Sequence, residues 1–143
     1  MGYPHYSVEC VDHHGLVRDF EGKRPVIVCL CGSTRFGDAF REANLAETLA
    51  GRIVLSIGCD MKADADLAAA GELGKDPETV KQELDQLHRR KIELADEVLV
   101  VSRDGYFGQS TAGEIAHAVT LGKPVRFAEY AAAKRAREAG LLA

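Results

Sequence analysis

The residues at 32–35, directly after the apolar run PVIVCLC and directly before a helical pattern, could bind an anion. Free backbone N–H groups and the positive end of the dipole at a helix start favour negative charge. Gly32 permits close backbone approach, while Ser33 and Thr34 offer hydroxyl donors. Arg35 adds a planar fork that matches phosphate oxygens. The segment predicts a phosphate site, although the same pattern is equally typical of a helix N-cap beside a solvated arginine.

A second segment, at 103–114, carries a candidate nucleophile. Gly108, Ser110 and Thr111 form its loop, and Glu114 is expected in the first turn of the following helix, where the dipole and loop amides keep it ionised. An ionised carboxylate can attack an electron-poor sugar carbon, as in retaining glycoside chemistry. Thr111 and Glu114 could equally form a capping box, and spacing does not separate the two interpretations.

The hydrophobic pattern predicts the elements that position these segments. Apolar runs predict four strands, at 25–32, 52–58, 97–102 and 124–130. Periodic stretches predict four helices, at 36–50, 77–95, 111–122 and 131–143. This alternation predicts an α/β fold with a flavodoxin-like (Rossmann-like) doubly wound parallel sheet in three α/β/α layers. Ligands of such sheets bind beyond the carboxyl ends of the strands, so both polar segments are expected at one crevice.

Length and composition predict one folded domain at 25–143, preceded by an arm or hairpin at 1–24, with a long loop at 59–76. The chain has 143 residues, of which 46% are hydrophobic and 28% charged, enough apolar content for a core. The net charge of −4 is dispersed along the chain, which disfavours nucleic acid as a partner. No run is long enough to span a membrane and no signal-like start is evident, so a cytoplasmic protein is expected.

Four cysteines are present, without a CxxC pair or a histidine at metal-ligand spacing. Because Cys29 and Cys31 lie inside an apolar run, they are expected to be reduced core thiols, as are Cys10 and Cys59 in or near the core. Neither a metal site nor a cofactor is expected.

Three motifs together resemble the nucleoside 2-deoxyribosyltransferase superfamily over most of residues 26–127. They are CGSTRF after an apolar strand, LADEVLVV, and a Gly/Ser/Thr-rich loop leading into GEIAHAVTLGKPV. The branch that looks most similar is the nucleoside 5′-monophosphate N-glycosidases. This resemblance implies a small flavodoxin-like domain, working as a homodimer, that cleaves the N-glycosidic bond of a nucleoside or nucleotide. It also implies residue roles: Glu114 as nucleophile, Gly32, Ser33 and Arg35 at the 5′-phosphate, and Gly108 and Ser110 in the second loop.

One position departs from the family pattern. The family carries an aspartate eight residues before the position of Asp96, and this chain has His88 there. His88 could bind a sugar hydroxyl or relay a proton, and Asp85 one turn earlier could substitute. Alternatively, the chain has lost the reaction and is a nucleotide-binding sensor or regulator, or the polar segments are caps in a purely structural interaction protein. Asp96 itself is expected to be a structural turn residue.

Two further positions carry open interpretations. Tyr106, with Phe107, is expected in the second loop, where the rings could stack on a base or contact a neighbouring subunit. His117 lies three residues after Glu114, and a packing or interface role is favoured over catalysis.

Overall fold

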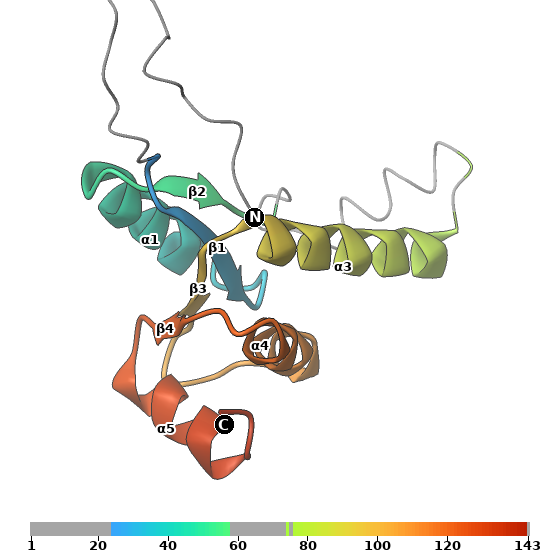
Figure 1. Ribbon diagram of the computed structural model, residues 1–143. Helices are drawn as coiled ribbons and strands as arrows, with labels where there is room; N and C mark the ends of the chain where they lie inside the picture. Colours follow the sequence, from blue (N-terminus) through green and yellow to red (C-terminus); the bar gives the residue numbers. More distant parts are fainter. Residues whose placement is uncertain (1–23, 58–73, 75, 143) are drawn as a thin grey trace, which may run out of the picture.

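The computed structural model describes residues 24–57, 74 and 76–142. Its four strands form one parallel sheet with the order β2-β1-β3-β4. The strands are β1 (Ile27–Gly32), β2 (Ile53–Leu55), β3 (Glu97–Val101) and β4 (Val125–Phe127). The helices are α1 (Gly37–Leu49), α3 (Pro77–Leu94), α4 (Gln109–Thr120) and α5 (Tyr130–Glu138) (Figure 1). The predicted flavodoxin-like, Rossmann-like α/β fold is confirmed, whereas the predicted N-terminal arm and most of the loop at 59–76 lie outside the described residues.

Helices cover both faces of the sheet, which gives the three predicted layers. Successive strand side chains point to opposite faces. Val28 and Leu30 therefore pack with Phe40 of α1, while Cys29 and Cys31 point into a core shared with α3, α4 and α5. Figure 1 shows α1 and α3 on opposite sides of β1. The side chains of Cys29 and Cys31 therefore meet residues of α3 and α4.

The two outer strands are shorter than the sequence pattern predicts. Strand β2 ends at Leu55 and β4 at Phe127, although the apolar runs continue to 58 and 130. Each outer strand pairs with a single neighbour over three residues, whereas β1 and β3 pair over five. A strand lasts only as long as it has a neighbour to pair with, and the apolar content of a segment does not show where that pairing ends. Prediction from apolar content therefore makes an edge strand too long.

Helix α3, which carries His88, is fixed at both ends. Its N-cap residue Asp76 accepts a hydrogen bond from the Thr79 backbone N–H at 3.1 Å, and Pro77 takes the first helical position. At the other end, Lys123 Nζ donates to the carbonyl oxygens of Ile92 and Ala95 at 2.9 and 2.5 Å. These carbonyls are the groups that a helix end leaves unsatisfied, so Lys123 anchors α3 to the segment before β4.

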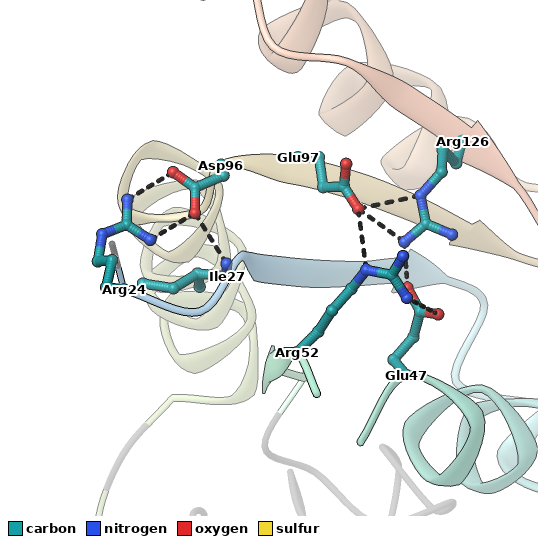
Figure 2. Close-up of polar contacts among 7 residues, drawn as sticks. All are labelled: Arg24, Ile27, Glu47, Arg52, Asp96, Glu97 and Arg126. Carbon is teal, nitrogen blue, oxygen red and sulfur yellow. Dashed lines mark hydrogen bonds and ion pairs between the residues drawn. The ribbon is translucent and has the colours of Figure 1, made fainter. Parts of the chain in front are cut away.

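A charged network joins α1 to β3, to β4 and to Arg52, the residue directly before β2 (Figure 2). Glu97 Oε1 accepts from Arg126 Nη2 at 2.8 Å and lies 3.8 Å from Arg52 Nε. Glu47, only 7% exposed, pairs with both arginines. Each buried carboxylate is therefore matched by guanidinium groups, as a buried charge requires. The network lies away from the carboxyl ends of the strands, so it supports the fold and not a ligand site.

Asp96→Asn is expected to destabilise the fold by about 1 kcal/mol at neutral pH, a figure reduced for solvent screening. Asp96 accepts from both terminal nitrogens of Arg24 at 2.5 Å and from the Ile27 N–H at 2.8 Å (Figure 2), as predicted for a structural residue. The Arg24 bond chiefly holds the pKa of Asp96 below its ordinary value. Its ionised form therefore stabilises the fold above the unfolded-state pKa, and this contribution is lost as pH falls through the folded-state pKa.

Urea unfolding of both proteins at neutral pH and at about pH 3 measures this effect. The difference between wild type and Asp96→Asn should shrink in acid. An equal difference at both pH values would contradict the assignment.

Candidate functional site

A cavity of about 390 Å³ lies at the carboxyl ends of β1 and β3, between the two polar segments. Its walls come from the loop after β1, the first two turns of α4 with its N-cap, and the facing surface of α3. The predicted site residues line it, with the exceptions of Arg35 and Tyr106. The lining residues are Gly32, Ser33, Thr34, Ile57, Lys81, Leu84, Asp85, His88, Gly108, Gln109, Ser110, Thr111 and Glu114. The predicted convergence of two loops from distant parts of the sequence is therefore present in the fold.

The first loop is a turn before α1 and not a helix cap. The Phe36 N–H donates to the Ser33 carbonyl oxygen at 3.1 Å, and the Arg35 N–H lies 3.4 Å from Ser33 Oγ. Phe36 occupies the N-cap position of α1 and no side chain caps that helix. The alternative in which Ser33 or Thr34 caps α1 is thus wrong, and both residues instead line the cavity.

Arg35 and Tyr106 pack against each other outside the cavity lining. The Arg35 guanidinium lies 4.6 Å from the centre of the Tyr106 ring, which meets Phe36 edge-on at 5.9 Å. Phe107 is only 4% exposed and belongs to the core. Phe107 is therefore not placed to stack on a base or to contact a neighbouring subunit, whereas Tyr106 is half-buried. A cation that does line the cavity is Lys81, which no motif in the sequence marks.

The second loop is held in place by Glu129. This carboxylate accepts from Ser102 Oγ at 2.5 Å and from the backbone N–H groups of Gly105 and Asp104 at 3.0 and 3.2 Å. These bonds, led by that from Ser102, lower the pKa of Glu129. They also fix a backbone that turns through positive φ angles of 54° at Asp104 and 73° at Gly105. Glu129 thereby sets the path along which the chain enters α4.

Glu114 lies deeper in α4 than predicted. The helix begins at Gln109 with Gly108 as N-cap, so Ser110 and Thr111, which were expected in the loop, belong to the helix. Glu114 is therefore in the second turn, and the alternative of a capping box with Thr111 is wrong. Thr111 is 2% exposed and Glu114 8% exposed. Burial, assisted by negative charge at Cys29 and Asp85, raises the pKa of Glu114 to about 7 against the opposing influence of His88. The expectation of a fully ionised carboxylate is wrong, because burial outweighs the helix dipole at this depth.

His88 contacts both Glu114 and the two buried cysteines of β1. Its Nε2 lies 3.3 Å from Glu114 Oε2, 3.4 Å from Cys31 Sγ and 3.7 Å from Cys29 Sγ. Burial lowers the pKa of His88, but the hydrogen bond with Cys29 and the charge of Glu114 raise it above its ordinary value. The second ring nitrogen, Nδ1, is buried and has no hydrogen-bond partner among the described residues. His88 is therefore a buried group at the junction of α3, α4 and β1.

The prediction that Cys29 and Cys31 are core thiols is confirmed, since both are fully buried and free. The Cys31 hydrogen bond to Cys29 lowers the pKa of Cys29 to about 5, and the same bond, together with burial, raises the pKa of Cys31. Linear spacing did not reveal that His88 joins them, because the three residues come from a strand and a helix far apart in sequence. The available signal was the Cys-x-Cys pattern, which puts both thiols on one strand face. Cys10 and Cys59 lie outside the described residues.

A second cavity of about 290 Å³ adjoins the first between α3 and α4. It shares Lys81, Asp85 and Glu114 with the first cavity and adds Arg89 and Gly113. Asp85, the predicted substitute for the family aspartate, thus faces the same space as Glu114. His117 lines neither cavity, and its Nε2 lies 3.5 Å from Glu93 Oε2, consistent with the favoured packing role.

No protein-family profile, curated protein or solved structure matches the chain when it is compared with each. Among the described residues, no helix combines the length and the apolar character needed to cross a membrane.

Proposed function

We propose that this protein cleaves the N-glycosidic bond of a nucleoside or nucleoside 5′-monophosphate, with Glu114 as the nucleophile. The observation that carries the proposal is the convergence of the loop after β1 and the start of α4 on one cavity that Glu114 lines. A volume of about 390 Å³ is within the range of small-molecule sites. The resemblance of the sequence motifs to the nucleoside 2-deoxyribosyltransferase superfamily supports the same chemistry.

The reaction follows the retaining pattern. A carboxylate oxygen of Glu114 attacks C1′, the bond from C1′ to the base nitrogen breaks, and its electron pair leaves with the base, which takes a proton from a water molecule. Water then attacks C1′, releases the Glu114 carboxylate and returns a proton to the site. The net products are the free base and the sugar or sugar phosphate. Transfer replaces hydrolysis if a second base takes the place of water.

His88 acts in this scheme as a positioning residue. Its Nε2 contact at 3.3 Å fixes Glu114 Oε2, which leaves the other carboxylate oxygen for attack. A raised pKa at His88 favours its charged form, and a cation beside Glu114 stabilises the carboxylate that the attack requires. This arrangement offers a function for histidine where the family pattern has aspartate.

Lys81 is proposed to bind the 5′-phosphate, beside the Ser33 and Thr34 hydroxyls. Lys81 lines the cavity, whereas Arg35 packs over Tyr106. Lys81→Gln is expected to raise KM for a nucleoside monophosphate about tenfold or more, the value of one charge-assisted hydrogen bond. KM for the corresponding nucleoside should not change.

Steady-state rates for Lys81→Gln, Arg35→Gln and the exposed control Lys134→Gln test this assignment. An increase in KM for Arg35→Gln alone would return the phosphate to the predicted Arg35 site and contradict the role of Lys81.

The activity itself is tested by incubating the full chain with a panel of nucleosides and their 5′-monophosphates and measuring free base. Release from at least one compound is the expected result. Calorimetry on the same panel separates the other outcomes. Saturable nucleotide binding without base release would replace catalysis with a sensor or regulatory module, and absence of both would overturn both proposals.

The binding module is the second candidate function. The contact of 3.3 Å between His88 Nε2 and Glu114 Oε2 favours it. A carboxylate that already interacts with another side chain of the protein is a weaker nucleophile. The homodimer implied by the family resemblance stays a prediction for either function.

A further inference from the structure

We propose that Cys29, Cys31 and His88 bind one transition-metal ion of the zinc type, with these three protein ligands and a fourth position for water. This inference goes beyond the proposed function and does not rest on it. Its starting point is that one sulfur from each cysteine and one ring nitrogen of His88 lie within 4.8 Å of one another, and all three residues are buried.

The sulfur-to-nitrogen distances agree with the edges of a tetrahedral site. Zinc bonds of about 2.3 Å to sulfur and about 2.0 Å to nitrogen put a sulfur and a nitrogen ligand about 3.5 Å apart. His88 Nε2 lies 3.4 Å from Cys31 Sγ and 3.7 Å from Cys29 Sγ. Glu114 Oε2 lies 3.3 Å from the same nitrogen, beside the group of three ligands.

The fold supplies these three ligands from rigid elements. Cys29 and Cys31 are two residues apart on β1, so both point to the same face of a central strand. His88 comes from the middle of α3, which packs against β1. Little rearrangement is needed to bring the three donors to one ion, which favours binding because less conformational freedom is lost.

The donor types select the ion. Two thiolates and an imidazole suit zinc and similar ions, whereas calcium and magnesium require oxygen ligands. The cavity reaches the cluster, because His88 lines it. An ion can therefore enter from the same side as a substrate.

A bound ion would compete with the proposed reaction. An ion on His88 Nε2 removes the contact through which that nitrogen positions Glu114 Oε2, so zinc should act as an inhibitor of base release. The site would then make turnover depend on the free zinc concentration.

The test uses the full reduced chain, freed of metal with a chelator and titrated with Co²⁺ or Zn²⁺ in the absence of nucleotide. One equivalent of Co²⁺ should bind and give thiolate-to-cobalt absorption together with the visible bands of a tetrahedral ion. Competition with a chromophoric chelator measures the zinc affinity. Cys29→Ala and Cys31→Ala should each weaken zinc binding by more than about 100-fold, the upper cost of losing an outer-shell partner. Cobalt that still binds to either variant should show a reduced thiolate absorption, because one thiolate remains.

The matched control is the double variant Cys10→Ser/Cys59→Ser, which should bind the metal like wild type. Circular dichroism establishes that each alanine variant is folded, and His88→Gln provides a second way to remove a ligand while both thiols remain. Metal binding that survives in both alanine variants, or that is lost only in the control, would overturn the proposal. Absence of one-equivalent binding to wild type would also overturn it. Because no nucleotide is present, each outcome is independent of whether the glycosidase proposal holds.

Discussion

Glu114→Gln is expected to reduce the rate of base release by at least about 1,000-fold, the order of loss that follows removal of a catalytic nucleophile. Glutamine has nearly the same shape as glutamate, so it can still fill the buried position on α4 where Glu114 is 8% exposed. Its neutral amide oxygen cannot form the glycosyl intermediate. The loss should therefore fall on kcat, while nucleotide binding measured by calorimetry is retained.

The matched control is Glu78→Gln, which makes the same chemical change at an exposed position in the first turn of α3. It should retain the wild-type rate. A Glu114→Gln protein that keeps more than about a tenth of the wild-type rate would rule out the nucleophile assignment, since residual catalysis of that size is incompatible with loss of a covalent step.

Gly32→Ala is expected to lower the free energy of unfolding by at least about 3 kcal/mol, a large share of the total stability of a small domain. A Cβ atom at this position would lie 2.3 Å from the backbone carbonyl oxygen of Val101. Gly32 and Val101 are paired across β1 and β3, the two central strands. Neither backbone can move without disturbing the sheet and the turn that begins the first cavity loop.

Urea unfolding monitored by circular dichroism measures this effect, and Gly108→Ala is the matched control. The new Cβ at Gly108 would lie 3.4 Å from the Tyr106 hydroxyl, which is an ordinary contact, and the φ angle of −90° suits alanine. That change should cost less than about 1 kcal/mol. Equal unfolding midpoints for the two variants would contradict the close packing of Gly32 against β3.

The fold and the meeting of the two loops could be predicted because they follow from local patterns. The spacing of apolar residues distinguishes strands from helices, and the topology of a parallel sheet places the carboxyl ends of β1 and β3 together. Gly32 was predicted to contact a phosphate, but it also has a structural role that the prediction did not include. A side chain at this position would clash with the carbonyl oxygen of Val101. That requirement depends on strand register, which no single segment encodes.

The electrostatics of the site could not be predicted in the same way. The pKa of Glu114 depends on how deeply α4 is buried and on neighbours from β1 and α3. Likewise, Arg35 packs over the ring of Tyr106, which lies about 70 residues away in sequence. Lys81 lines the cavity because α3 packs beside it. Interactions between distant segments determine these positions, so motif spacing cannot supply them.

The central claim is that Glu114 bonds to C1′ of a nucleotide held between the two loops. It is tested most directly by acid-quenching the protein during turnover of a nucleoside 5′-monophosphate and measuring its intact mass, followed by peptide mapping. The predicted result is one added sugar phosphate, located on the α4 peptide that contains Glu114 and absent from Glu114→Gln. Attachment of the sugar phosphate to a different residue, or persistence of the adduct in Glu114→Gln, would contradict the claim.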